Sequence, residues 1–330
     1  MLFRSMKKVV VFGGAGFVGS RLSKFLQQKY EVTVVDSFWF WDSVDQYKEL
    51  SGFTGKCIVE DIRSKDIKRL MTGKDAVISL ACLSNDTSSD IDYNFTHDVS
   101  YNGVMNVIQS AISKKVPKLI QTSTTSVYGI KQGKLVTEKE VPEPITQYAK
   151  IKSELDHVLG YYMTRSSTGI SSLRPATLYG YSPRLRLDIM VNTMLDRAIR
   201  ENKLMVEGGE QCRPCLHVDD LCQAYQACIQ NPKSNGKIYN VTNENYSVNQ
   251  VVDIIKSVIP EVEIHYQHVL DQRSYKTSSA LIKKDLGLKF KKRLKTSVKK
   301  LHQEIMFGKH DRDKTINMKV IKRLLKGGVN

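Results

Sequence analysis

The chain has 330 residues, enough for one large domain or two smaller ones, and its 41% hydrophobic and 25% charged content is that of an ordinary globular protein. Its formal net charge of +16 favours acidic partners such as nucleotides and phosphorylated sugars. No apolar run approaches the ~20 residues of a membrane-spanning helix, and the amino terminus lacks the long apolar segment of a signal peptide, so no membrane partner is expected. Six cysteines without framework spacing are typical of reduced thiols, which indicates a cytoplasmic protein.

The first half of the sequence alternates short apolar runs with longer amphipathic segments. The apolar runs predict strands and the longer segments predict helices between them, an order that indicates parallel βαβ units. Because the strand runs are apolar throughout, the sheet is expected to be covered on both faces. Strands are predicted at residues 7–13, 31–36, 56–61, 75–82, 118–124 and 169–176, and helices at residues 17–28, 101–114 and 146–163.

The loop after the first predicted strand has the sequence GGAGFVG, which places Gly13, Gly16 and Gly19 at three-residue spacing before a helix. Glycines in this strand–turn–helix setting let the backbone approach a pyrophosphate closely, and the helix N-terminus supplies free N–H donors. The alternative is a tight turn that binds no ligand. We predict a dinucleotide site, with Phe17 and Val18 also in contact with the cofactor.

Acidic residues follow the second and third predicted strands. Asp36 ends the second strand 17 residues after Gly19. A carboxylate there accepts hydrogen bonds from the ribose diol of adenosine and repels a 2′-phosphate, so NAD is preferred over NADP. Asp61 is placed to meet the adenine edge, although a solvated turn acid is an equally good interpretation. Further cofactor contacts are expected at Ile62, Leu80 and Ala81.

Beyond Pro175 the pattern becomes less regular, without an internal repeat or a low-complexity linker. The fold class indicated by these patterns is α/β: a Rossmann-type, doubly wound parallel sheet with a smaller C-terminal α/β lobe that binds substrate. Residues 309–330 carry seven Lys or Arg against two Asp, and we expect a loosely held basic tail. Binding of this tail to nucleic acid or to a membrane surface is the alternative to a solvated face, which is favoured.

Tyr148 and Lys152 lie four residues apart in YAKIK, so a helix places both on one face, although surface pairs of this spacing also arise by chance. They follow the glycine loop, the strand-ending aspartate and the hydroxyl-rich QTSTTSVYG, in that order. Together these motifs resemble the extended short-chain dehydrogenase/reductase family, in its NAD-dependent nucleotide-sugar epimerase/dehydratase branch. Later segments are similar to landmarks of that branch up to about residue 305: LRPATLYG at 173–180, RPCLHVDDL at 213–221, YNVTN at 239–243 and DQRSYKTSSALIKKDLGL at 271–288.

The resemblance implies that a sugar hydroxyl, usually at C4, gives a hydride to NAD while Tyr148 takes its proton. A tyrosine with a pKa near ~10 is a poor base, and Lys152 and the positive nicotinamide ring are expected to lower that pKa by stabilising the phenolate. By the same resemblance, Thr124 contacts the reacting hydroxyl and relays the proton. Thr125 and Ser126 stand where sugar-nucleotide 4,6-dehydratases carry Asp and Glu, which argues against elimination of water.

Substrate contacts are expected after the fourth strand and in the second half of the chain. Asn85 is expected to face the sugar, and Thr177 stands where related epimerases often carry a contacting Asn. The amide of Asn192 is a candidate for binding the diphosphate of a nucleotide sugar. Arg213 and Arg273 are further candidates, since arginine matches phosphate oxygens bidentately.

Other polar features have an ordinary structural interpretation. Arg184 and Arg186 are as well explained by solvated surface charges as by phosphate contacts. The Cys212 and Cys215 pair has no second pair at zinc-finger spacing and the seven histidines form no cluster, so no metal site is predicted.

The expected organisation is an NAD-binding domain at residues 1–180, to which 214–245 returns, a substrate lobe at 181–213 and 246–308, and the basic tail at 309–330. The favoured function is an NAD-dependent nucleotide-sugar 4-epimerase that works through a transient 4-keto sugar. A 4-dehydrogenase that releases the 4-keto product requires the same catalytic residues and stays open. The alternative from another class is a catalytically idle NAD-binding protein whose tail binds nucleic acid. From the resemblance we expect a homodimer, and nucleic acid is not expected as a partner.

Overall fold

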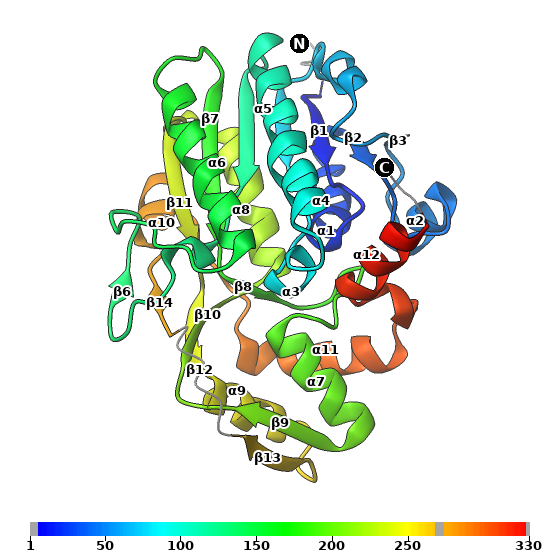
Figure 1. The fold of residues 1–330 in the computed structure, drawn as a ribbon, viewed down its shortest axis with the longest axis vertical. Helices are drawn as coiled ribbons and strands as arrows, with labels where there is room; N and C mark the ends of the chain where they lie inside the picture. Colours follow the sequence, from blue (N-terminus) through cyan, green and yellow to red (C-terminus); the bar gives the residue numbers. More distant parts are fainter. Residues whose placement is uncertain (1–5, 268–273, 328–330) are drawn as a thin grey trace.

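The structure is a computed structural model that describes residues 6–267 and 274–327. Seven strands of the described chain form one parallel sheet in the order β11-β7-β5-β4-β1-β2-β3 (Figure 1). The chain runs from β1 outward to β2 and β3 and then returns to β4 on the other side of β1, so the winding direction changes between β1 and β4. The strands are β1 (Lys8–Phe12), β2 (Glu31–Asp36), β3 (Lys56–Val59), β4 (Ala76–Ser79), β5 (Lys118–Thr122), β7 (Gly169–Pro175) and β11 (Lys237–Val241).

Helices cover both faces of this sheet. Along β1, Val9 and Val11 pack into one hydrophobic core and Val10 and Phe12 into the other, because successive side chains of a strand point to opposite faces. The first core includes α1 (Phe17–Leu26), α2 (Val44–Ser51), α8 (Val218–Gln230) and α10 (Ala280–Leu286); the second includes the 3-10 segment Lys65–Met71, α5 (Val104–Ser113) and α6 (Gln147–Met163). The predicted doubly wound α/β fold is therefore confirmed.

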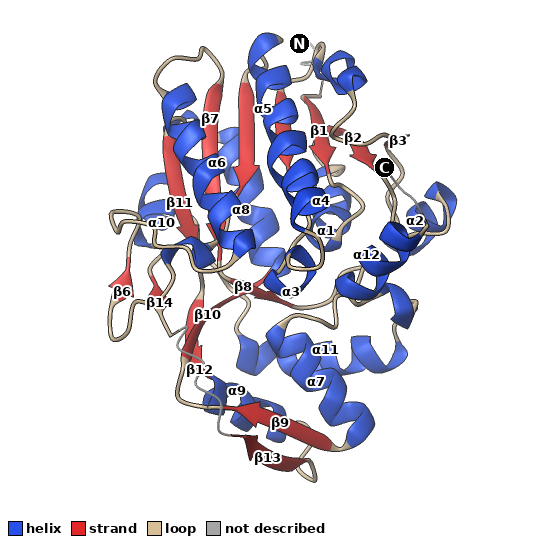
Figure 2. Cartoon of the chain, viewed as in Figure 1, coloured by secondary structure: helices blue, strands red, loops and turns tan. Residues whose placement is uncertain are grey.

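A smaller α/β lobe lies at the carboxyl ends of the sheet strands (Figure 2). Its core joins α7, α9 and α11 around buried residues such as Leu195, Val251 and Leu301. Its elements are β8 (Thr177–Tyr179), β10 (Cys212–His217) and β12 (Glu244–Ser247) in one sheet, β9 (Lys203–Glu207) and β13 (Glu263–Gln267) in another, and the helices α7 (Met190–Glu201), α9 (Val248–Lys256) and α11 (Leu294–Phe307).

Short elements connect these two parts. They are α3 (Asp86–Ser89), α4 (Tyr93–His97) with a following π-helical turn (Asp98–Gly103), the paired strands β6 (Leu135–Val136) and β14 (Lys276–Thr277), and the 3-10 segments Thr125–Tyr128, Pro232–Ser234 and Arg312–Lys314.

The carboxyl-terminal segment is packed against the rest of the molecule. After α11 the chain forms α12 (Asn317–Lys326), whose Val320 and Ile321 are buried. Ile321 belongs to a small core with Leu83 and Val99, next to the sheet. The expectation of a loosely held tail is therefore wrong, because the basic residues of this segment alternate with apolar residues that form one buried helix face.

Within the described part of the chain, none of the helices combines the length and the apolar character needed to span a bilayer.

Candidate active site

A cavity of about 530 Å³ lies where the carboxyl ends of β1, β4 and β5 meet the smaller lobe. This is the position at which parallel α/β sheets bind ligands, and the volume is that of a small-molecule site. The predicted site residues that line it are Gly13, Gly16, Phe17, Val18, Gly19, Asp36, Asp61, Ile62, Leu80, Ala81, Asn85, Thr124, Tyr148, Lys152, Thr177 and Arg213.

The glycine loop forms the floor of the cavity beside α1. Gly13 has φ 77°, and a Cβ atom there would lie 2.6 Å from the backbone nitrogen of Ala81. A Cβ atom on Gly19 would lie 2.1 Å from the carbonyl oxygen of Gly13, so only glycine lets α1 approach the loop this closely. The N-terminus of α1 has no side-chain cap and no acidic residue in its first turn. Its first N–H groups therefore fit the diphosphate of a dinucleotide.

Two acidic residues predicted to contact the cofactor, Asp36 and Asp61, line the cavity near the ends of β2 and β3. The carboxylate of Asp36 accepts hydrogen bonds from the backbone nitrogens of Ala15 at 2.9 Å and Phe38 at 2.8 Å. Burial raises the pKa of Asp36, and these hydrogen bonds together with the charge of Arg184 oppose that rise. Asp61 also lines the cavity, but its carboxylate binds the guanidinium of Arg63 at 2.9 Å.

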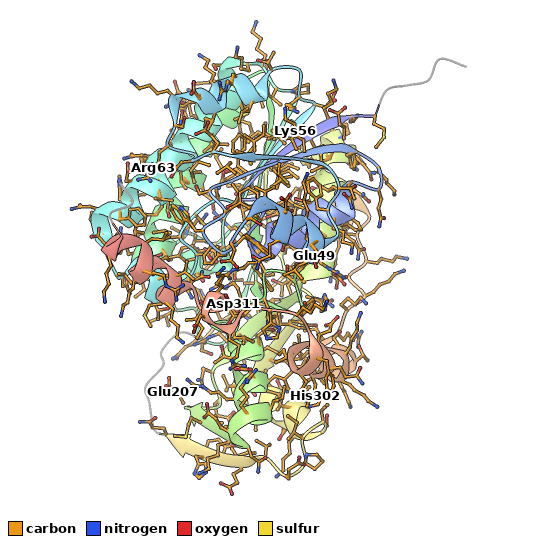
Figure 3. All side chains as sticks on the ribbon, turned by 90° about the vertical axis from the view of Figure 1, so that its right-hand side faces the viewer. Glu49, Lys56, Arg63, Glu207, His302 and Asp311 are labelled. Carbon is orange, nitrogen blue, oxygen red and sulfur yellow. The ribbon has the colours of Figure 1, made fainter. Side chains whose placement is uncertain are left out.

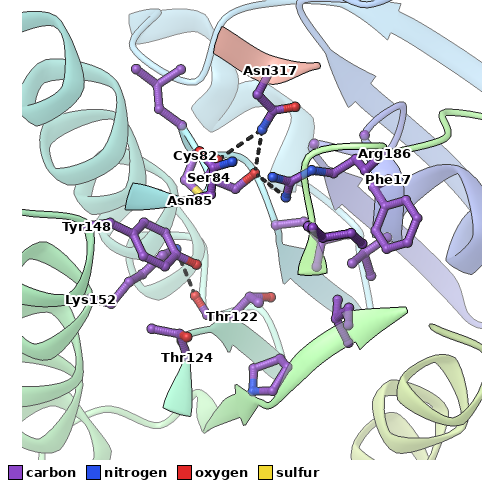
Figure 4. Close-up of a pocket in the computed structure, with 18 of the residues that line it drawn as sticks. Phe17, Cys82, Ser84, Asn85, Thr122, Thr124, Tyr148, Lys152, Arg186 and Asn317 are labelled. Atoms are coloured by element: carbon purple, nitrogen blue, oxygen red, sulfur yellow. Dashed lines mark hydrogen bonds between the residues drawn. The ribbon is translucent and has the colours of Figure 1, made fainter. Parts of the chain in front are cut away.

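Helix α6 positions the tyrosine and the lysine. Its first turn is capped by Thr146, whose hydroxyl accepts from the Ala149 nitrogen at 3.3 Å. The Lys152 ammonium is buried, donates to the Thr122 carbonyl oxygen at 3.0 Å and lies 5.8 Å from the centre of the Tyr148 ring (Figure 4). The hydroxyl of Thr124, at the exit of β5, lies beside Tyr148 in the cavity lining and favours a lower pKa of that tyrosine. The structure thus brings together the three residues predicted to be catalytic.

The electrostatic surroundings of Tyr148 include a cation that the sequence did not assign to it. Burial raises the pKa of Tyr148, and the charge of Asp86 adds to that rise. The cation that lowers this pKa most is Arg186, whose role as a surface charge was left open by the sequence. Lys152 also holds the end of β5 through its ammonium.

A buried polar network lies behind the reactive strand exit. The carboxylate of Asp156, two turns after Tyr148 on α6, accepts from the hydroxyl of Ser123 at 2.8 Å. It also accepts from the hydroxyl of Ser172 at 2.6 Å and from Nε of Arg174 at 2.7 Å. Asp156 therefore ties α6 to β5 and β7, which fixes the residue next to Thr124.

The predicted substrate residues divide into three groups. Asn85, Thr177 and Arg213 line the cavity. Asn192 does not: it is fully buried, its Oδ1 accepts from the Gly180 nitrogen, and its Nδ2 donates to the carbonyl oxygens of Gly180 and Arg186. The prediction that Asn192 contacts the diphosphate is wrong because both ends of its amide are used by the backbone. Arg273 lies outside the described residues.

The cavity has further polar residues whose role the sequence left open or did not predict. Arg184 and Arg186 line it and are only 4% and 7% exposed, so they are not solvated surface charges. Asn317, from α12, lines it as well. The apolar spacing of Val320 and Ile321 is the signal that could have predicted a packed helix at this end of the chain.

A model of the NAD dependent epimerase/dehydratase family matches residues 9–242. The chain belongs to this family. The resemblance predicted from the motifs is therefore confirmed, and with it NAD as the cofactor of the family and an enzyme of the nucleotide-sugar epimerase/dehydratase class. The glycine cradle, the uncapped helix N-terminus and Asp36 fit that cofactor.

Relatives with several activities resemble this chain. A GDP-6-deoxy-D-talose 4-dehydrogenase from Aggregatibacter actinomycetemcomitans is 26% identical over 79% of this chain and 82% of its own length. An uncharacterized UDP-glucose epimerase, YtcB, from Bacillus subtilis is 28% identical over 76% of this chain and 82% of its own. The structure of the UDP-glucuronic acid 4-epimerase from Bacillus cereus, in complex with UDP-glucuronic acid and NAD, superposes with a TM-score of 0.82 at 22% identity, over 91% of this chain and 99% of that chain.

Proposed function

We propose that this enzyme is a nucleotide-sugar 4-epimerase that works through a transient 4-keto sugar. The observation that carries the proposal is the arrangement of Thr124, Tyr148 and Lys152 on one wall of the cavity, with hydroxyls at Thr125 and Ser126. A hydroxyl at these two positions does not replace the Asp and Glu pair expected of a 4,6-dehydratase, because it is neither a carboxylic acid nor a carboxylate base.

The side chains of this enzyme take up and return the proton of the C4 hydroxyl. Tyr148 takes the proton of the C4 hydroxyl as C4 gives up its hydride, and it returns a proton to the ketone oxygen when the hydride comes back. Thr124 lies beside Tyr148 in the cavity lining and binds the same sugar hydroxyl. Lys152 fixes the strand end that bears Thr124 by donating to the Thr122 carbonyl. Bound NAD supplies the hydride acceptor and the positive nicotinamide ring that stabilises a phenolate.

Arg186 adds a second cation at this site. Its charge lowers the pKa of Tyr148, against the rise caused by burial. Asp188 binds Arg186 through Nε at 2.8 Å and also accepts from Nδ2 of Asn85 at 3.2 Å. This arrangement supports a sugar position between Asn85 and Tyr148.

A 4-dehydrogenase is the second candidate, because one relative carries that activity. The two reactions share the oxidation step and differ in the fate of the ketone: an epimerase lets it turn and reduces it again, whereas a dehydrogenase releases it. Retention of the cofactor in its cavity through the whole cycle is therefore the property that separates them.

The test uses the purified enzyme, supplemented with NAD, and a panel of UDP-, GDP-, CDP- and dTDP-sugars. We expect one substrate to be converted into its C4 epimer, resolved by chromatography, without accumulation of reduced-nicotinamide absorbance. Reduced cofactor that accumulates in proportion to a keto product would replace the epimerase with the dehydrogenase. Tyr148→Phe is the matched control and should abolish either signal.

We also propose a homodimer that uses the outer faces of α5 and α6. Tyr161 on α6 is 57% exposed, which supports an apolar contact there. Light scattering should give twice the mass of the 37.5 kDa chain, and a monomer mass would reject the dimer. All six cysteines fall within the described residues as free thiols, which supports a reducing compartment such as the cytoplasm.

A further inference from the structure

The segment after α11 crosses from the smaller lobe to the sheet domain. Arg312 donates to both carboxylate oxygens of Asp196 on α7, at 3.1 and 2.9 Å. Lys314 forms an ion pair with Asp42, in the loop after β2. Figure 3 shows Asp311, at the start of this stretch, between the part of the molecule that bears Lys56 and the part that bears His302. The segment is therefore attached to both sides of the cavity.

Helix α12 then covers one wall of the cavity with Asn317 and Ile321. Asn317 is 3% exposed, and its Nδ2 donates to the carbonyl oxygen of Ser84 at 2.9 Å and to the Ser84 hydroxyl at 3.1 Å. Its backbone nitrogen donates to Asp188 at 2.8 Å, and its Oδ1 accepts from Nη2 of Arg184. One side chain thus joins the loop after β4 to the loop that carries the two buried arginines.

These arginines are incompletely paired. Among the residues that the structure describes, Nε of Arg184 and Nη2 of Arg186 have no hydrogen-bond partner. Burial and the charge of Arg186 lower the pKa of Arg184 to about 9. Asp188 binds Arg186, whereas the contact of Arg184 through Nη2 is to the neutral amide of Asn317. The charges of Asp188 and Asp36 act on Arg184, but the two buried N–H donors without an acceptor are costly unless an anion in the cavity accepts from them.

The position of Arg184 and Arg186 indicates which anion they bind. The arginine loop rests on the N-terminus of α1, because the Ser182 hydroxyl donates to the Phe17 carbonyl at 2.6 Å and hydrogen-bonds Ser20 at 2.8 Å. Arg186 reaches the Ser84 hydroxyl at 3.1 Å, and Figure 4 shows it on the same side of Ser84 as Phe17. The loop that carries both arginines therefore packs against the N-terminal turn of α1, where a dinucleotide places its diphosphate.

We propose that residues 309–326 are a strap that holds the cofactor in its cavity. Within it, Asn317 is a positioning residue that keeps Arg184 and Ser84 oriented so that Arg184 and Arg186 bind the diphosphate of NAD. Retention of the cofactor by the strap does not depend on which sugar reaction the enzyme performs. The strap lies beyond residue 242, where the matched family region ends, so it adds a carboxyl-terminal segment to the cofactor site.

The test is the affinity for NAD, measured by calorimetry on protein stripped of cofactor. Asn317→Ala should weaken NAD binding about 10-fold or more, the cost of misplacing a hydrogen bond to a charged group. Lys322→Ala, on the exposed face of the same helix, is the matched control and should leave the affinity unchanged. Equal NAD affinity of Asn317→Ala and wild-type protein would overturn the proposal.

Two further measurements separate this role from a general structural one. If Asn317 acts through Arg184, the double variant Asn317→Ala with Arg184→Gln should bind NAD no more weakly than Arg184→Gln alone, whereas additive losses would contradict the coupling. UDP serves as the probe for the diphosphate of a sugar nucleotide. If Asn317→Ala loses affinity for UDP but keeps its affinity for NAD, the two arginines bind the substrate diphosphate instead, and the strap proposal is rejected. If Asn317→Ala does not fold, the affinities of Arg184→Gln for NAD and for UDP decide the same question.

Discussion

Replacing Asp156 with asparagine should remove the only negative charge among the described residues that hydrogen-bond Arg174. Asp156 is 3% exposed and Arg174 is 4% exposed, so the pair is shielded from water. The substitution keeps the shape of the side chain, but it leaves the guanidinium of Arg174 with neutral partners, the amide of the new asparagine and the hydroxyl of Tyr128 at 2.8 Å. Arg174 therefore becomes a buried charge without a hydrogen-bonded counter-ion.

The expected cost follows from this loss of the counter-ion. Removing one partner of a buried ion pair costs about 3–5 kcal/mol, and one retained amide oxygen of asparagine favours the lower end, about 3 kcal/mol. Urea unfolding followed by circular dichroism should show a lower midpoint with an unchanged slope. Asp253→Asn, on the exposed side of α9, is the matched control and should change the unfolding free energy by less than about 0.5 kcal/mol.

The double variant Asp156→Asn with Arg174→Met supplies the decisive comparison. Removing both charges should recover part of the lost stability, because no unpaired charge remains. Turnover should fall in Asp156→Asn at a temperature where the protein is fully folded, since Ser123 would lose its carboxylate partner next to Thr124. A stability loss below about 1 kcal/mol, or a double variant less stable than Asp156→Asn, would refute the reasoning.

Three other substitutions test separate parts of the molecule. Lys152→Met should lower turnover about 100-fold with little change in NAD affinity. Stopped-flow absorbance of reduced nicotinamide measures the rate of the oxidation step, and a near-normal rate would contradict this prediction. Asp36→Ala should weaken NAD more than NADP in calorimetric titrations, and equal losses would reject the ribose contact. Burial lowers the pKa of His217 from 6.5 to about 4, so its stabilising effect is present above pH 6.5 and is lost as the pH falls toward 4. As the pH falls from 6.5 to about 5, the free energy of unfolding measured with urea should therefore fall by about 2 kcal/mol. His217→Asn, which retains a capping acceptor for α8, should remove this pH dependence. The same pH dependence in both proteins would assign it to other groups.

Much of the sheet domain could be predicted because its signals are local. The apolar run of β1, the glycines that follow it and Asp36 at the end of β2 lie within one βαβ unit, so their mutual geometry is set by a short stretch of backbone. The same holds for Tyr148 and Lys152, which one helical turn places on a common face. Gly13, Gly16, Gly19, Asp36, Tyr148 and Lys152 line the cavity.

Residues whose role depends on a distant partner could not be assigned in this way. Asn192 has the chemistry of a phosphate ligand, but the loop of residues 180–186 folds back over α7 and uses both ends of its amide. Arg184 and Arg186 are equally well explained as surface charges until the packing of that loop on α1 buries them.

The family, the glycine loop and the helix that bears Tyr148 and Lys152 thus follow from the sequence alone, since each is encoded in contiguous residues whose mutual geometry is local. The far side of the cavity depends instead on how the chain folds back on itself. Asn317 meets Ser84 across 233 positions of the chain and Arg184 across 133. Periodicity and spacing in the sequence do not predict contacts between residues so far apart in the chain, because these contacts depend on where α12 packs against the sheet domain after the smaller lobe.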